Sequence, residues 1–528
     1  MKIQQRGFTI VELLVVIVVI AVLAAVVIFG YGAWRNQLAA DAIKSDLTNA
    51  ATAMESARNF GSGYPTDIPA SYTASENSTV RYVMGDEGQF CLEGRSKVMN
   101  GIYYFIDSSK GTEPLEGTCA GGEGATPDWT IFVYDTTMPS CTSLTMHLPI
   151  TSPTSAPGSE IDWGDGSTGT LTSSVQSHTY ATPGEKVVQY KGPITTVNAY
   201  SIPTASRQCL KEVRQWSDTI TPTTVTFKAA NNVQRVAEPP KSVTDMSEMF
   251  WSARSFNQNI GSWDVSHVTD MEYMFYDARA FNQNINSWDV SNVTNMRYMF
   301  GTADAFNQPL DSWDVSKVTN IAGMFNNTDA FNQPLNSWNT SNVTNMNGVF
   351  SFAAAFNQPI GSWNTSKVTD MSGMFIAAPF NQPIGSWNTG NVTTMASMFS
   401  NGAKFNQPIH TWDTSKVTNM SFMFSNNDTF NKPLNGWNTS NVTNMSSMFT
   451  GASVFNGAIG SWDVTKVTNM LNMFKEASAF NQPLATWNTQ NVVNMFGMFQ
   501  YATSYNQNLS SWNVTVSYTH LTLPTIYS

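Results

Sequence analysis

A tryptophan recurs at a nearly fixed interval through the second half of the chain, and this period constrains the fold more than any other feature. Successive tryptophans are 25 residues apart, except for one gap of 24 residues between Trp363 and Trp387. Such a period is typical of repeat proteins, in which each unit is too small to bury its own apolar side chains and stacks on its neighbours. The array begins near Val243, and its tryptophans are Trp263, Trp288, Trp313, Trp338, Trp363, Trp387, Trp412, Trp437, Trp462, Trp487 and Trp512.

The order of residues within one representative unit predicts its local structure. The stretch Phe356–Trp363 alternates apolar and polar residues and is expected to form a short strand. Met371, Met374 and Phe375 have the spacing of one face of a short helical turn. Thr369 stands where the N-cap of that turn is expected.

Identical residues recur at the same place in every unit and form columns. The Trp, Phe and Met columns are predicted to stack in the core, and an exposed tryptophan ladder that binds sugars is the alternative. The asparagine column is expected to act as an amide ladder that satisfies turn backbone; its members are Asn257, Asn282, Asn307, Asn332, Asn357, Asn381, Asn406, Asn431, Asn456, Asn481 and Asn506. Positions that vary between units are the better candidates for recognition, and they include Tyr276, Asp277, Arg297, Tyr298, Asn326, Asn327, Ser421, Phe422, Leu471, Asn472, Lys475 and Glu476.

The unit FNQPIGSWNTSKVTDMSGMF resembles a bacterial surface-protein repeat of roughly 26 residues, which is a relative of leucine-rich repeats. The resemblance covers about Val243–Asn513. It implies a leucine-rich-repeat-like solenoid of about eleven units over residues 221–515. Members of that family are commonly cell-surface or secreted proteins, often with a suspected role in adhesion, so the resemblance implies display outside the cell.

The N-terminus carries a segment with the length and composition of a membrane span. From Phe8 to Ile28 the chain is apolar except for Thr9 and Glu12, which is long enough to cross a bilayer. Lys2 and Arg6 precede the segment, so the bulk of the chain is expected outside the inner membrane. An ionised glutamate at membrane depth costs several kcal/mol and requires a partner.

The stretch Gly7-Phe8-Thr9-Ile10-Val11-Glu12-Leu13-Leu14 resembles the leader and mature start of type IV pilins and pseudopilins. The resemblance implies that residues 1–7 are a leader, that a prepilin peptidase cuts between Gly7 and Phe8, and that Phe8 is then N-methylated. It also implies that Glu12 pairs with the N-terminal amine of another pilin-like subunit during assembly. A signal peptide cleaved near Ala21–Ala25, or a plain membrane anchor, remains the alternative.

Two smaller domains are expected between the membrane segment and the array. Residues 8–60 should form the membrane and pilin helix, and residues 61–127 a pilin-like head with short strands. Residues 128–220 are expected to form a β-sandwich-like module, with strand candidates at Thr130–Tyr134, Leu144–Pro149, Glu160–Trp163 and Lys186–Tyr190. The segment from Ile161 to Gly184 resembles the polycystic-kidney-disease type of β-sandwich module, although Glu185–Gly192 lacks the cleaner strand expected to close it. Asp162 and Asp165 in this segment either ligate a cation or, as their Asp-Gly context favours, form a tight turn.

Four cysteines lie in the first half of the chain, and none has the short spacing of a zinc site. In an exported protein an even count favours two disulfides, with three possible connectivities. We favour Cys91–Cys119 and Cys141–Cys209, because each pair then lies within one expected domain. Free buried thiols are the alternative.

Residues 516–528 depart from the repeat pattern. They resemble a translated sequencing-adapter read-through and would then be non-native; an atypical capping strand is the alternative. The predicted fold class of the chain is multidomain α+β, with a transmembrane α-helix, a small pilin-like head, a β-sandwich-like module and the solenoid.

Composition and motifs narrow the function. The net charge is −11 and no basic stripe occurs, which argues against nucleic acid as a partner. Only five histidines occur, without a metal-ligand cluster or a catalytic motif, so we expect neither an enzyme nor a cofactor. The sequence favours a surface adhesion protein displayed on or built into a pilus-like assembly, with an extracellular protein or glycan as ligand. A structural minor pilin or envelope protein, whose array is only a spacer, is the alternative.

Overall fold

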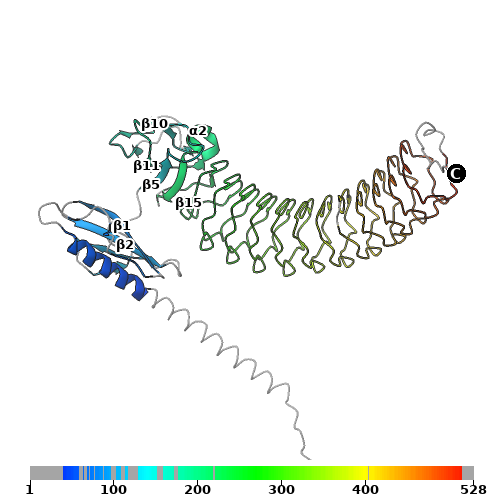
Figure 1. Ribbon diagram of the computed structural model, residues 1–528, viewed down its shortest axis with the longest axis horizontal. Helices are drawn as coiled ribbons and strands as arrows, with labels where there is room; N and C mark the ends of the chain where they lie inside the picture. The colour runs from blue at the N-terminus through cyan, green and yellow to red at the C-terminus, as the bar shows by residue number, and fades with distance from the viewer. Residues whose placement is uncertain are drawn as a thin grey trace, which may run out of the picture. The chain divides into compact units, whose positions relative to one another are not determined.

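The computed structural model describes residues 40–58, 64, 68–69, 72–75, 78–86, 89–96, 103–108, 113–116, 129–151, 158–171, 176–217, 220–401 and 404–513. The chain divides into two compact units, Met1–Pro127 and Asp128–Ser528 (Figure 1). Each unit has its own core, and the two are described separately.

In the first unit a helix packs on one antiparallel sheet. Residues 40–56 are helical, and the sheet has the order β1-β2-β3-β4. Ile43 and Leu47 on the helix are fully buried against Leu92 and Ile106 of the sheet. The helix lies close to the sheet because residue 94 is glycine: a Cβ there would lie 2.9 Å from Cγ of Leu47. The strands are β1 Ser78–Asp86, β2 Gln89–Ser96, β3 Tyr103–Asp107 and β4 Leu115–Glu116.

The second unit begins with a β region built around a six-stranded sheet of order β15-β13-β5-β11-β8-β9. Smaller sheets have the orders β10-β6 and β14-β12-β7. The strands are β5 Thr130–Asp135, β6 Thr145–His147, β7 Ile150–Thr151, β8 Glu160–Asp162, β9 Thr168–Gly169, β10 Ser177–Thr179, β11 Glu185–Lys191, β12 Thr196–Asn198, β13 Leu210–Gln215, β14 Thr224–Thr226 and β15 Arg235–Val236. Two short helices, η1 Ala199–Ser201 and α2 Thr204–Arg207, precede β13.

The strand candidate Lys186–Tyr190 is confirmed, and the expectation that Glu185–Gly192 lacks a clean closing strand is wrong. Strand β11 occupies Glu185–Lys191 and is central, because it pairs antiparallel with β5 on one side and with β8 on the other. The apolar–polar alternation of β11 is weak in the sequence because only Val188 and Tyr190 are buried, while most of its other side chains are partly exposed. A strand covered incompletely on both faces has no strict apolar–polar period.

The β region covers the first turn of the array. Strand β14 pairs in parallel with β12, and its residue Thr224 forms a parallel bridge with Asp245 in the first repeat. One continuous cluster of buried side chains runs from Phe132 in β5 to Trp512 in the last unit. A stacked array needs its terminal apolar face covered, and the β region provides that cover at the N-terminal end.

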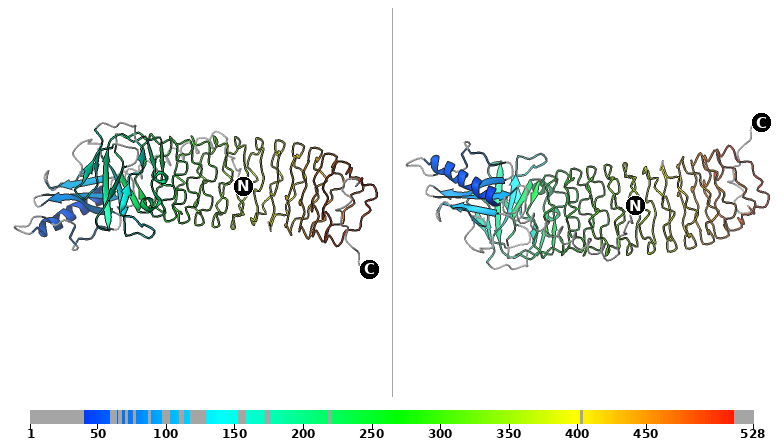
Figure 2. Two further views of the ribbon diagram at one scale, coloured as in Figure 1. Left: turned by 90° about the horizontal axis from the view of Figure 1, so that it is seen from above. Right: turned by 90° about the horizontal axis from the view of Figure 1, so that it is seen from below.

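Each unit of the array is a coil of turns joined to its neighbours, and the coils lie side by side in Figures 1 and 2. Alternate backbone donors after the Val-Thr pair bond to the next coil: those of Met371, Gly373 and Phe375 reach carbonyl oxygens of the following unit at 2.8–3.1 Å. The donors between them close local turns, as Met374 and Ile376 do by bonding three residues back. A single-residue parallel bridge joins consecutive coils from Asp245 to Asn494.

The columns form the interior of the coils. Trp363 is only 3% exposed, and its indole Nε1 donates to the carbonyl oxygen of Leu335 in the preceding coil at 2.9 Å. Phe350 stacks on Phe356 of its own coil at 3.7 Å and on Phe375 of the next at 5.8 Å, measured between ring centroids. The prediction that these columns are core is confirmed, and the exposed tryptophan ladder is excluded.

The predicted fold class is wrong. The described residues are dominated by sheets and turns, and none of their helices is long and apolar enough to cross a membrane. Residues 8–39, which contain the predicted span, lie outside the described residues. The units also lack the features of a leucine-rich repeat: Phe356–Trp363 is not a strand, and Met371–Phe375 is a pair of linked turns rather than a helical turn. Thr369 is not a cap, because its hydroxyl donates to the carbonyl oxygen of Thr344 in the preceding coil.

Candidate functional site

Four positions of each coil lie on the backbone that bonds to the next coil, and we call their residues the turn strip. They are the two residues between the methionines of the Met-x-x-Met-Phe motif and the two residues after its phenylalanine. Their side chains range from buried, as in Ser421, to exposed, as in Phe422. In the coil of Met371 they are Ser372, Gly373, Ile376 and Ala377. The variable residues singled out in the sequence all belong to this strip.

The second residue of each pair adopts a left-handed backbone. In one coil Gly348 has a φ of 61° and Phe352 a φ of 59°. This conformation directs alternate backbone N–H groups toward the next coil, while the N–H groups between them close local turns. The left-handed backbone is therefore required at these positions whatever side chain they carry. Glycine accepts it without steric cost, whereas other residues are strained. The strip therefore keeps one backbone geometry and varies its side chains.

Every aromatic side chain of residues 243–513 that lies outside the interior columns belongs to the turn strip. Phe352 and Phe422 are each 46% exposed, and Tyr501 is 63% exposed. Aromatic residues are enriched at binding surfaces because they combine a large apolar area with few rotatable bonds. The full set is Trp251, Tyr273, Tyr276, Tyr298, Phe352, Phe422, Phe496 and Tyr501.

Four of these rings, Trp251, Tyr273, Tyr276 and Tyr298, form an aromatic cluster on the first three coils. Trp251 stacks on Tyr273 with centroids 4.7 Å apart, and Tyr273 stacks on Tyr298 at 5.3 Å. Tyr276 lies edge-on to Tyr273 at 5.3 Å. All four side chains are partly exposed.

Charged groups are paired around the aromatic cluster. The ammonium of Lys228 lies 3.7 Å from the ring centroid of Trp251 and 2.9 Å from a carboxylate oxygen of Glu248. Arg297 lies over Tyr273 and is 2.6 Å from Glu272. Cation–π contacts of this kind contribute about 0.5–1 kcal/mol at exposed sites.

A second ion-pair group lies beside the aromatic cluster. Asp277 contacts Arg254 at 2.7 Å and Arg279 at 2.6 Å. Burial raises the pKa of Asp277, but hydrogen bonds from Arg279, Arg254 and Ser252 outweigh burial and hold this pKa below its ordinary value. The carboxylate is therefore ionised at neutral pH and fixed by its partners.

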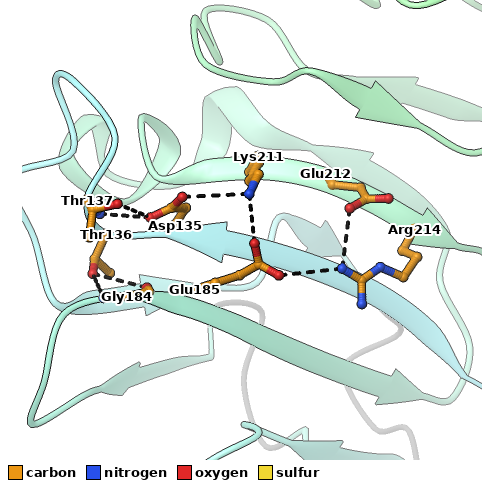
Figure 3. Close-up of polar contacts among 8 residues, drawn as sticks. All are labelled: Asp135, Thr136, Thr137, Gly184, Glu185, Lys211, Glu212 and Arg214. Carbon is orange, nitrogen blue, oxygen red and sulfur yellow. Dashed lines mark hydrogen bonds and ion pairs between the residues drawn. The ribbon is translucent and has the colours of Figure 1, made fainter. Parts of the chain in front are cut away.

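Five charged residues on the six-stranded sheet form a chain of ion pairs (Figure 3). Lys211 lies 2.7 Å from Glu185 and 3.7 Å from Asp135, and Arg214 contacts both Glu185 and Glu212. Hydrogen bonding to Glu185 raises the pKa of Lys211, so its charge persists at neutral pH. These neighbouring strands carry opposite charges that satisfy one another, which is a structural role.

Asp162 and Asp165 serve a turn, as their Asp-Gly context predicts. Asp162 accepts a hydrogen bond from the backbone of Gly164 at 2.8 Å, and Asp165 accepts one from Ser167 at 3.1 Å. His178 lies 2.7 Å from the second oxygen of Asp165. In the part of the chain that the structure describes, no group of three or more His, Cys, Asp or Glu side chains is arranged to hold a metal ion.

The residues predicted for processing and assembly, Gly7, Phe8 and Glu12, lie outside the described residues. Cys141 and Cys209 form a disulfide with Cα atoms 4.8 Å apart. Cys91 is also disulfide-bonded, and Cys119 lies outside the described residues.

The asparagine column performs the predicted amide-ladder role. The side-chain oxygen of Asn332 accepts hydrogen bonds from the backbone N–H of Asn357 at 3.0 Å and from the side chain of Gln358 at 3.1 Å. The same contact recurs along the array, as from Asn506 to Asn481. The column therefore joins neighbouring coils.

Sequence reasoning named Tyr276, Arg297 and Tyr298 as variable residues but did not find the aromatic cluster. It missed Trp251 and Tyr273, although both stand at variable positions of the first two units. The signal that could have found them is the concentration of aromatic and charged residues at these positions in the first three units, whereas the next unit carries Ala322, Gly323, Asn326 and Asn327 there.

A stack of 25-residue coils with repeated interior columns and one variable strip defines an extended repeat protein. Models of the family described as "Mycoplasma protein of unknown function, DUF285" match residues 223–336, 308–380, 376–452 and 426–522, which together cover more than half of the chain. The chain belongs to this family.

A model of the prokaryotic N-terminal methylation motif matches residues 2–28. The two matches together are consistent with a surface protein. The resemblance of the middle segment to a polycystic-kidney-disease module receives no support from the family matches. No curated protein and no solved structure shows significant similarity to the chain.

Proposed function

We propose that this protein is a non-enzymatic, cell-surface adhesion protein that binds extracellular ligands through the turn strip. The observation that carries the proposal is the location of all eight outward aromatic side chains of the array on that one strip. A scaffold used only as a spacer has no need of exposed rings, and exposed apolar side chains on a soluble surface carry an aggregation cost unless they bind something.

The N-terminus places the array outside the cell in this proposal. The methylation-motif match at residues 2–28 supports cleavage between Gly7 and Phe8 by a prepilin peptidase and methylation of Phe8. Glu12 then pairs with the N-terminal amine of a neighbouring pilin-like subunit, which offsets the cost of a carboxylate in the membrane. The protein is thereby held in a pilus-like assembly.

Adhesion of cells that display the full chain tests the proposal. We expect cells with the native chain to attach to a target surface, and cells whose chain lacks residues 223–513 to lose that attachment while the N-terminal processing, followed by mass spectrometry, is unchanged. Equal attachment of both strains, together with an altered number of surface fibres in the deletion strain, would instead establish a structural role.

A further inference from the structure

The first three coils differ from the rest of the array in both rings and charges. Their turn strip carries the aromatic cluster and the acidic and basic residues Glu248, Glu272, Asp277 and Arg297. The next three coils have glycine at the position of Tyr298, namely Gly323, Gly348 and Gly373. The backbone is the same in all six coils, so the difference is not required by the fold.

Glycines next to the aromatic cluster leave space for its rings. A Cβ at Gly301 would lie 2.8 Å from Cδ2 of Tyr276, and a Cβ at Gly323 would overlap the ring of Tyr298. Two rings therefore lie directly over backbone of the following coil. This packing holds the rings in place before any ligand arrives, which lowers the entropy cost of binding.

The aromatic cluster extends onto the β region through Lys228. The Lys228 ammonium lies 5.3 Å from the ring centroid of Tyr200, in addition to its contact with Trp251. Tyr200 is 56% exposed, and Arg207 stacks on it at 4.9 Å. Residues from β-region helices and from the first coils thus meet at one surface.

The polar groups at this surface suit hydroxyl-rich ligands. Among the described residues, the hydroxyls of Tyr200, Tyr273, Tyr276 and Tyr298 have no hydrogen-bond partner. Each phenol can donate to and accept from a sugar hydroxyl. The aromatic bodies can pack against the C–H face of a pyranose, which is the apolar side of a sugar ring.

The charges of the coils at this surface favour a neutral ligand. Lys228 is paired with Glu248 and Arg297 with Glu272. An anionic ligand would have to compete with these carboxylates for both cations. Arg207 on the β region is only 7% exposed, and its guanidinium donates to the carbonyl oxygen of Tyr200 and the hydroxyl of Thr204. The paired carboxylates can still accept hydrogen bonds from sugar hydroxyls, because an ion pair leaves lone pairs of the carboxylate free.

The extent of the aromatic cluster fits an oligosaccharide better than a protein. Three coils about 4.8 Å apart span on the order of 10–15 Å. This is the length of two or three pyranose units, whereas a stable protein partner covers about 800 Å² on each side.

We propose that Tyr200, Trp251, Tyr273, Tyr276 and Tyr298, with the paired charges around them, form a binding site for a neutral oligosaccharide of two or three pyranose units. The inference rests on the proposed function and names the ligand class of one part of the turn strip.

The full chain in detergent micelles, presented to a panel of neutral, sialylated and sulfated oligosaccharides, tests this inference. We expect binding to neutral members, and a loss of at least tenfold in affinity in Tyr200→Ala and in Tyr276→Ala. Val454→Ala, which shortens an exposed apolar side chain outside the turn strip, is the control and should bind like the native chain. Tyr276→Phe keeps the ring and should lose only a few-fold.

Thermal unfolding of each variant separates loss of the site from loss of the fold. Glu272→Gln is a further variant, which removes the carboxylate paired with Arg297 and keeps every ring of the site. No binding of the native chain to any oligosaccharide would overturn the inference. Binding only to acidic members would overturn the neutral ligand class, and binding unaffected by both Tyr200→Ala and Tyr276→Ala would overturn the location. Cell attachment that persists in these variants but is lost without residues 223–513 would leave the adhesion function standing while rejecting this site.

Discussion

Single residues of the turn strip combine variable side chains with a backbone conformation that never varies. Asp277, Phe352 and Ala377 occupy the same position in different coils and have φ values of 56°, 59° and 53°. Left-handed backbone costs roughly 1–2 kcal/mol for residues other than glycine. The array therefore tolerates local strain at many positions, because the bonds to the next coil hold the turn in place.

Replacing a strained alanine by glycine should stabilise the array. Ala377→Gly removes the steric cost of the left-handed turn, and we expect the free energy of unfolding to rise by about 1 kcal/mol. The adjacent Ala378, fully buried and without a positive φ, is the matched control. Ala378→Gly should lower the free energy of unfolding by about 1 kcal/mol. Denaturant unfolding of the two variants tests the opposite signs, and a loss of stability in both would contradict the strain argument.

The turn at Asp165 should make the β region sensitive to acid. Hydrogen bonds from Ser167 and His178 lower the pKa of Asp165 to about 2. A carboxyl group whose pKa is lower in the folded state contributes stability above its ordinary pKa and loses it as the pH falls toward the folded value. We therefore expect the native protein to have a higher Tm than Asp165→Asn at pH 5, with the difference vanishing near pH 2. A difference that stays constant over this range would show that the charge of Asp165 is not responsible.

At the level of elements, consecutive coils are joined by three kinds of contact that recur at every step. Backbone bonds link the turn strips, stacked rings fill the interior, and the asparagine column adds side-chain bonds, as Asn357 does with the backbone N–H of Asn381 at 2.9 Å. Each contact joins nearest neighbours only. Stability of the array is therefore expected to be a sum over units and their interfaces.

Removing one amide from the asparagine column should weaken one interface. Asn357→Ala leaves the backbone N–H of Asn381 and the side chain of Gln382 without their acceptor. We expect a loss of about 1–2 kcal/mol, because part of the site can be reached by water. Asn357→Asp retains acceptor oxygens and should lose less than half as much. Equal losses in the two variants, measured by denaturant unfolding, would contradict the amide-ladder role.

For the second unit as a whole, the β region and the array share one continuous core. Phe227, which follows β14, stacks on Phe250 of the first coil at 6.1 Å, so the boundary between them is crossed by the same ring column that fills the array. The β region is thus a cap for the first coil. The same arrangement brings Tyr200 and Lys228 to the aromatic cluster.

Deletion of one whole unit should leave the fold intact. Removing residues 317–341 joins Ser316 to Asn342 and restores every column in register. We expect a folded protein with cooperative unfolding and a smaller denaturant m-value, since less surface is exposed on unfolding. Removing only residues 317–329 breaks the columns and should produce an unstable or aggregated chain. Similar stability of the two deletions would show that coil register does not govern the array.

The sequence by itself determined the period of the array, the residues of its columns and their burial. Apolar side chains repeated every 25 residues can only be buried by stacking neighbours, so Trp363 and Phe375 were predictable core residues. The strands β5, β8 and β11 were also predictable in part, from Thr130–Tyr134, Glu160–Trp163 and Lys186–Tyr190.

Only the tertiary structure decided the backbone of the coils and the composition of the aromatic cluster. The spacing of Met371, Met374 and Phe375 fits a helical turn, but alternate N–H groups bond to the next coil, and such bonds depend on a neighbour that local spacing does not show. Tyr200 and Trp251 are far apart in the chain, and they meet because Lys228 lies between their rings after the β region has capped the array. Local patterns fix what must be buried, whereas contacts between distant segments fix where the exposed groups come together.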